Sequence, residues 1–237
     1  MVRTLPRRTV LTSLLALPAV AMLATACSDS GEAEAQAQTP QPSTETTAAV
    51  EAPKPAGTVD MDKLLEEGGL PEKVLGEADA PVTIVEYASM TCGHCANFHK
   101  NTLPAIKEKY IDTGKVRLIF REFPFDPRAE AGFMLARCSD DKYFAMVDTL
   151  FRQQDNWARA EDAVGALSQL SKLAGFSQES FEACLTDQKL LDDIRAVRTR
   201  GAEEFGVDST PTFFINGNKY AGSMSVDEMS AIIDSML

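Results

Sequence analysis

Two cysteines stand three residues apart in the segment Thr91-Cys92-Gly93-His94-Cys95, which directly follows a strand-like apolar run. A strand, a short turn and a helix would place both sulfurs on the first helical turn, where they can form and break a disulfide. Cys92 would then lie at the helix N-terminus, where unpaired N–H groups and the positive end of the helix dipole stabilise a thiolate. His94 can add positive charge beside the sulfur. The segment therefore predicts a lowered pKa for Cys92 and thiol–disulfide exchange chemistry.

Other uses of the cysteine pair fit the sequence less well. A c-type haem site needs His directly after the second cysteine, where this chain has Ala96. A zinc site could use Cys92, Cys95 and His99, but no second CxxC or HxxxH motif supplies further ligands. An inert structural pair is the third alternative, although two thiols on one helical turn seldom serve packing alone. We expect redox chemistry in the Cys92–Cys95 disulfide itself, with no metal and no other cofactor.

Glu86 interrupts the apolar run 81–87 that precedes the cysteines. A charged side chain in a buried strand is costly unless it is paired. Glu86 is therefore either at the strand end in water or a buried proton acceptor. Its position six residues before Cys92, on the strand that leads to the motif, favours the buried acceptor.

Length and composition indicate a globular protein that does not bind nucleic acid. The 237 residues allow one domain with appendages or two small domains, and 44% hydrophobic content is enough for a sizeable core. The formal net charge is −12, and no basic stripe with interleaved aromatic residues is present. A phosphate backbone would repel such a chain.

Residues 1–26 have the pattern of an export signal. Arg3, Arg7 and Arg8 precede an uncharged apolar run over 9–24, and small residues follow it. The run is short for a membrane span, and the Arg7-Arg8 pair resembles a twin-arginine signal, although such pairs also occur in ordinary signals. We expect an extracytoplasmic, periplasmic location.

Cleavage before Cys27 would expose a cysteine that resembles the lipidated residue of bacterial lipoproteins. That pattern usually has Leu three residues earlier, where this chain has Ala24, so lipid anchoring to a membrane and simple secretion both stay open. Residues 27–58 are rich in Ala, Glu, Gln, Thr and Pro. With little to bury, they are expected to form a disordered tether ahead of a folded domain over 59–237.

The folded part begins with a short helix or extended segment over 61–70 and an edge strand over 73–76. Strand 81–87, a helix over 92–110 with a kink at Pro104, and strand 115–123 then form a βαβ unit, which is parallel and right-handed.

An all-helical insertion follows over about 127–205. Asn216-Gly217 between apolar runs predicts a type I′ hairpin, and a capping box at Ser225 opens the last helix. Cys138 and Cys184 fall on apolar faces of the insertion, where they are either buried free thiols or, as an exported chain favours, a structural disulfide.

This order of elements, βαβ, helical insertion and then ββα, resembles the thioredoxin-like fold of the DsbA family of periplasmic dithiol oxidases. The resemblance covers about residues 70–237. It implies that Pro211 is a cis proline beside the active-site disulfide and that Thr210 offers backbone hydrogen bonds to substrate. It also matches Glu86 to the family's buried acid. Two departures concern the oxidising strength: Gly-His replaces the commoner Pro-His between the cysteines, as in protein disulfide isomerase, and Thr210 replaces Val.

Three functions follow as alternatives. The first is a monomeric oxidase that introduces disulfides into reduced or unfolded exported proteins and is re-oxidised by a DsbB-like membrane partner. The second is a disulfide reductase or isomerase of the same fold that an electron donor keeps reduced. The third is a tethered scaffold or metal-binding lipoprotein that has kept the fold without the chemistry. The resemblance to the DsbA family and the expected stability of the Cys92 thiolate favour the oxidase.

Overall fold

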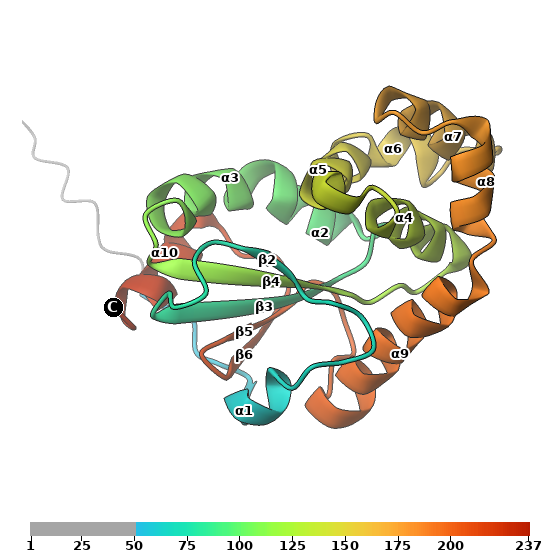
Figure 1. The fold of residues 1–237 in the computed structure, drawn as a ribbon. Helices are drawn as coiled ribbons and strands as arrows, with labels where there is room; N and C mark the ends of the chain where they lie inside the picture. The colour runs from blue at the N-terminus through green and yellow to red at the C-terminus, as the bar shows by residue number, and fades with distance from the viewer. Residues whose placement is uncertain (1–50) are drawn as a thin grey trace, which may run out of the picture. The chain divides into compact units, whose positions relative to one another are not determined.

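The computed structural model describes residues 51–237, which contain one mixed sheet with strand order β1-β6-β5-β3-β4-β2. The central strand is β3 (Val82–Ala88), and all seven of its residues are buried. Figure 1 shows it between β4 and β5, with helices on both faces of the sheet. The other strands are β1 (Gly57–Thr58), β2 (Lys73–Leu75), β4 (Val116–Glu122), β5 (Thr212–Ile215) and β6 (Asn218–Ala221). Burial on both faces explains the near-continuous apolar run of β3.

The predicted βαβ unit is confirmed. β3 and β4 pair in parallel, with Glu86 opposite Phe120, whereas the other neighbouring strands pair antiparallel. Between β3 and β4 the chain is helical from 93 to 111, in four successive pieces. They are α2 (Gly93–Asn97), the π-helical η1 (Phe98–Thr102), α3 (Leu103–Ile106) and the π-helical η2 (Lys107–Ile111). Pro104 cannot donate a backbone hydrogen bond, and the widened π-helical turns occur on either side of the short piece that contains it.

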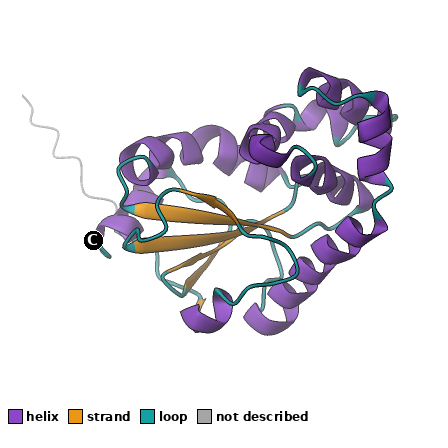
Figure 2. Ribbon diagram, in the orientation of Figure 1, coloured by secondary structure: helices purple, strands orange, loops and turns teal. Residues whose placement is uncertain are grey.

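The helical insertion predicted over about 127–205 is also present (Figure 2). It contains α4 (Pro127–Arg137), the 3₁₀ turn η3 (Asp140–Lys142), α5 (Tyr143–Arg152), α6 (Gln154–Trp157), α7 (Ala163–Leu173), α8 (Gln178–Leu185) and α9 (Gln188–Phe205). A disulfide joins Cys138 to Cys184 across a sequence separation of 46 residues. On the chain-entropy estimate, closing a loop of that length stabilises the fold by about 4 kcal/mol.

The hairpin turn and the capped helix predicted near the C-terminus are both present. Asn216 and Gly217 both have positive φ, 44° and 85°, as a type I′ turn requires. The turn joins β5 to β6. Ser225 caps α10 (Val226–Asp234) in a reciprocal capping box with Glu228. This ββα unit completes the thioredoxin-like fold.

The prediction that residues 27–58 form a disordered tether is wrong for the last residues of this segment, which are part of the sheet. Gly57 and Thr58 form β1 and pair antiparallel with β6, and the Ala56 N–H donates to Lys219 O at 2.8 Å. The short α1 (Met61–Leu64) follows. Pairing of β1 uses backbone groups and needs no apolar side chains, so composition gave no sign of it. The signal peptide, Cys27 and the rest of the tether up to residue 50 lie outside the described residues.

Among residues 51–237, no helix combines the length and the apolar character that a membrane crossing needs.

Candidate active site

The two cysteines of the motif lie on the first turn of α2, at the end of the central strand. Cys92 is the N-cap residue, with extended backbone dihedrals, and Cys95 follows inside the helix. Both are free thiols, but their exposure differs: Cys92 is half-buried, whereas Cys95 is fully buried. The buried strand β3 therefore delivers one accessible and one covered sulfur to the same helix end.

The surroundings of Cys92 lower its pKa to about 5. The largest cause is a hydrogen bond with the Cys95 thiol, which outweighs partial burial of the sulfur. The Thr210 side chain and the backbone N–H groups of Cys95 and His94 add to the effect. His94 thus contributes through its backbone amide at the helix N-terminus, and its side chain is exposed. The pKa of Cys92 is lowered, in the direction that the sequence predicts, but the causes include the backbone of His94 and not its imidazole.

Cys95 has the opposite character. The pKa of Cys95 is raised well above the ordinary value. Burial is the largest cause, followed by the hydrogen bond with Cys92 and the negative charge of Glu86. Cys95 therefore holds its proton while Cys92 is a thiolate. One sulfur is a nucleophile and the other is a buried acid.

The loop before β5 faces the first cysteine. The Thr210–Pro211 peptide bond is cis, as the family resemblance implied. The Cys92 thiol donates to the Thr210 backbone oxygen at 3.2 Å, across 118 residues of sequence. The Thr210 hydroxyl is buried, and within residues 51–237 its Oγ1 has no hydrogen-bond partner. When Cys92 loses its proton, this hydroxyl is available as a donor to the sulfur anion.

Glu86 is buried, as predicted, and its partner is His99. The carboxylate is completely buried, and each of its oxygens lies 3.1 Å from His99 Nε2. His99 belongs to η1 and follows Cys95 by four residues, so it lies on the same side of the helix. From the sequence, His99 is a candidate zinc ligand. The structure instead pairs its Nε2 with Glu86.

Two further sets of side-chain hydrogen bonds support the turn that holds the cysteines, and no sequence pattern indicated either. Gln154 of the insertion donates to the backbone oxygens of Met90 and Cys92, at 2.8 and 3.0 Å. Thr91 donates to the Asp126 carboxylate at 2.6 Å. A polar residue in an amphipathic stretch carries no signal for a contact 62 residues away, so Gln154 could be identified only from the packing.

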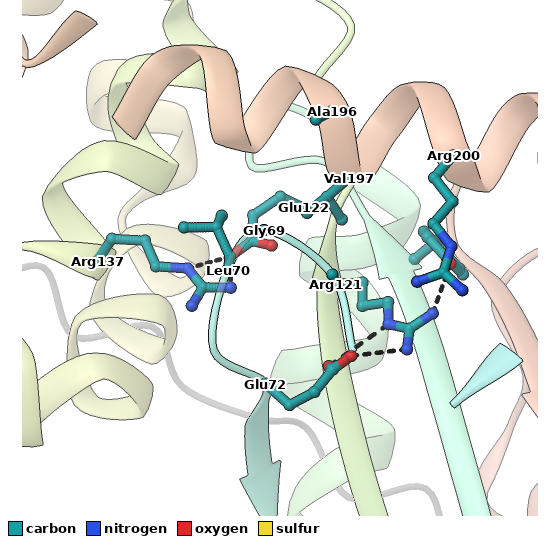
Figure 3. Close-up of a pocket in the computed structure, with 11 residues that line it drawn as sticks. Gly69, Leu70, Glu72, Arg121, Glu122, Arg137, Ala196, Val197 and Arg200 are labelled. Carbon is teal, nitrogen blue, oxygen red and sulfur yellow. Dashed lines mark hydrogen bonds and ion pairs between the residues drawn. The ribbon is translucent and has the colours of Figure 1, made fainter. Parts of the chain in front are cut away.

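A separate cavity lies between α9 and the loop that precedes β2, and Figure 3 shows its side chains. Three arginines line it, each already paired with carboxylates: Arg121 with Glu72, Arg137 with Glu122, and Arg200 with Glu66 and Glu204. The cavity includes neither cysteine of the motif. Among residues 51–237, no cluster of three or more His, Cys, Asp or Glu side chains could hold a metal ion.

Comparison with known proteins agrees with the fold. Residues 70–235 match the model of a family described as Thioredoxin. A protein-disulfide oxidoreductase of Rickettsia bellii is 33% identical over 168 residues, 70% of this chain, and the match spans only 64% of that relative. The disulfide bond formation protein D of Bacillus anthracis is 29% identical over 175 residues, 70% of this chain and 78% of the relative.

Solved structures give the same result. The crystal structure of α-DsbA1 from Wolbachia pipientis has a TM-score of 0.68 and 35% identity, covering 74% of this chain and 94% of that one. BdbD from Bacillus subtilis, at 20% identity and a TM-score of 0.63, shares the fold over 79% of this chain and 98% of its own. The chain therefore belongs to the DsbA-like family of protein-disulfide oxidoreductases within the thioredoxin fold.

Proposed function

We propose that this protein is a dithiol oxidase that introduces disulfides into exported proteins through the Cys92–Cys95 pair. The observation that carries the proposal is the asymmetry of the two sulfurs. The pKa of Cys92 is lowered to about 5, whereas that of the buried Cys95 is raised. Stabilisation of the Cys92 anion favours the reduced enzyme and makes Cys92 a good leaving group from the mixed disulfide, so reduction of the enzyme by its substrate is favourable.

The reaction starts from the oxidised enzyme. A substrate thiolate attacks Cys92 Sγ, the bond between Cys92 and Cys95 breaks, and its electron pair goes to Cys95, which takes up a proton. The second substrate thiolate attacks the substrate sulfur of this mixed disulfide and releases Cys92 as a thiolate. The substrate gains a disulfide and the enzyme holds two reduced cysteines. The backbone of Thr210 and Pro211, beside Cys92, is suited to bind an extended substrate chain.

The cellular setting follows from this direction of electron flow. The reduced enzyme needs a membrane re-oxidant of the DsbB type, and its substrates are reduced or unfolded exported proteins. The Cys138–Cys184 disulfide supports an oxidising, extracytoplasmic location. The exposure of His94 on the first turn of α2 supports a role in contacting substrate or re-oxidant.

The test combines activity with trapping of the intermediate. The full-length oxidised protein is expected to oxidise a reduced peptide that contains two cysteines. Cys92→Ala should abolish this activity. Reduced Cys95→Ala should accumulate a mixed disulfide with an excess of the peptide in its disulfide-bonded form: Cys92 attacks one peptide sulfur, the other leaves as a thiolate, and no Cys95 thiol remains to displace the peptide. If Cys92→Ala oxidises the peptide as fast as the unaltered protein does, the proposal is wrong.

The second candidate is a reductase or isomerase, which the Cys-Gly-His-Cys motif favours through its likeness to protein disulfide isomerase. The reduction potential separates the two. A value near that of thioredoxin, about −270 mV, would support a reductase, whereas one near that of DsbA, about −120 mV, supports the oxidase.

A further inference from the structure

The cavity in Figure 3 is lined by residues that neither the cysteine site nor the proposed function uses. It lies where the loop before β2, the end of β4 and the helices α4 and α9 meet, and its volume is about 230 Å³. That volume is several times the room that one water molecule takes. The junction therefore has space for a small molecule, away from the disulfide chemistry.

One carboxylate oxygen in the wall of this cavity lacks a hydrogen bond. Glu122 is fully buried, and Arg137 places both Nε and Nη2 at 2.6 Å from its Oε1. The Tyr143 hydroxyl donates to the same oxygen at 3.0 Å. Oε2 has no partner among residues 51–237. An arginine fork commonly serves both oxygens of a carboxylate, and a buried acceptor without a donor is costly. A donor from a ligand in the cavity would remove that cost.

The same cavity contains an unused donor. The Tyr87 side chain is buried, and its hydroxyl accepts from Arg121 Nη1 at 2.8 Å. A phenol can accept and donate at once, and within the part of the chain that the structure describes the proton of this hydroxyl has no acceptor. The cavity thus offers one acceptor, on Glu122, and one donor, on Tyr87.

The charges around the cavity are already balanced. Each of the three arginines that line it is paired with at least one carboxylate, so neither an anion nor a cation is needed. The apolar part of the wall includes Leu70, Ala196 and Val197. Apolar walls with a few convergent polar groups are typical of small-molecule sites. The expected ligand is therefore uncharged, with an apolar body and one polar end.

We propose that this cavity binds a small, uncharged aromatic amide. The amide N–H group donates to Glu122 Oε2, the amide oxygen accepts from the Tyr87 hydroxyl, and the ring packs against Leu70 and Val197. An amide carries a donor and an acceptor side by side without net charge, whereas a carboxylate would place a second negative charge beside Glu122. An aromatic body also suits the arginines, because guanidinium groups stack on flat rings. The site is independent of the direction in which the cysteines work.

The first test titrates the oxidised full-length protein with benzamide and follows the methyl NMR signals of Leu70 and Val197. Both signals are expected to shift along one saturable curve with a millimolar dissociation constant, which suits so small a ligand. Acetophenone is the matched control ligand, because it replaces the amide NH₂ group by a methyl group and keeps the ring and the carbonyl. It should bind about tenfold more weakly or worse, since it leaves Glu122 Oε2 without a donor.

Substitutions test where the ligand binds. Val197→Phe puts a ring into the cavity and should abolish benzamide binding, followed at Leu70. Val164→Phe makes the same change at a position of α7 that is 59% exposed and does not line the cavity, and it should leave binding unaltered. Tyr87→Phe removes only the hydroxyl. It should weaken benzamide and acetophenone alike, by about fivefold, because both ligands lose the donor to their carbonyl oxygen.

Three results would overturn the inference: no saturable shift at Leu70, equal affinity for benzamide and acetophenone, or benzamide binding that survives Val197→Phe. If Val197→Phe does not fold, the comparison of the two ligands on the unaltered protein decides alone. Peptide oxidation plays no part in these measurements, so a failure of the proposed oxidase and a failure of this site are told apart.

Discussion

Two buried carboxylates on neighbouring strands are used differently in this protein. Glu86 of β3 and Glu122 of β4 are both fully buried. Glu86 meets the imidazole of His99, from the helix that carries the cysteines. Glu122 meets the guanidinium of Arg137 from α4, at 2.6 Å (Figure 3), and accepts from the Tyr143 hydroxyl of α5 at 3.0 Å. The chain thus pairs one acid with the active-site helix and the other with the insertion.

The partners decide what each carboxylate can do. A guanidinium keeps its protons at every accessible pH, so the Glu122–Arg137 pair is fixed in charge. An imidazole, unlike a guanidinium, can exist with or without its charge, so the partner of Glu86 does not fix the charge of the pair. Burial alone therefore does not distinguish the two acids, but their partners do.

The largest expected effect is on the fixed pair. Arg137→Leu leaves Glu122 charged and buried without its counter-ion, which typically costs about 3–5 kcal/mol. Urea denaturation should report that loss of stability, with no change in the rate at which dithiothreitol opens the Cys92–Cys95 disulfide. Arg137→Lys keeps the charge and should lose less. A slower opening of the disulfide in folded Arg137→Leu would show that the two acidic sites are coupled and would remove the distinction between them.

Much of the fold was predictable because its signals are local. Asn216-Gly217 specifies the hairpin through its positive φ angles, and Ser225 caps the last helix through residues next to it. The position of Glu86, on a strand that ends at a CxxC motif, was enough to predict a buried acid. In each case the residues that give the signal are also the residues that form the structure.

The partners of the acidic side chains were not predictable in the same way. In the sequence, His99 could be grouped with the cysteines as a candidate zinc ligand. Its contact with Glu86 comes from the packing of η1 against β3, which no local pattern shows. Arg137 and Gln154 lie on insertion helices whose amphipathic patterns show which face is buried but not what it covers. β1 was missed because backbone pairing with β6 leaves no trace in side-chain composition.

The second prediction concerns the active-site region, whose stability should depend on pH and redox state together. In the folded reduced protein the pKa of Cys92 is about 5, against 9.0 for an unperturbed cysteine. A lowered pKa stabilises the folded form fully above the unfolded value, and this contribution is lost as pH falls through the folded value. The stability of the reduced form relative to the oxidised form should therefore decrease steadily as pH falls from about 9 to about 5.

Urea denaturation of both redox forms at several pH values measures this difference, and groups that titrate alike in the two forms, such as those around Glu122, cancel. Parallel pH curves for the oxidised and reduced proteins would mean that the Cys92 thiolate is not stabilised by the fold. Cys92→Ser is the matched control: it can form neither the disulfide nor the Cys92 thiolate, so its pH curve should run parallel to that of the oxidised protein.

The smallest effect should come from neutralising the acid beside the thiols. Glu86→Gln removes a negative charge that helps to raise the pKa of Cys95, so that pKa should fall. It should nevertheless stay above the ordinary cysteine value, because burial is the larger cause and the substitution leaves Cys95 buried. The pH dependence of Cys95 in the reduced protein, followed by NMR of labelled cysteine, measures the change. Glu122→Gln makes the same chemical substitution on the next strand and should leave Cys95 unaffected. An equal shift in both variants would mean that Cys95 responds to the total buried charge, and the two acids would no longer differ in their effect on the thiols.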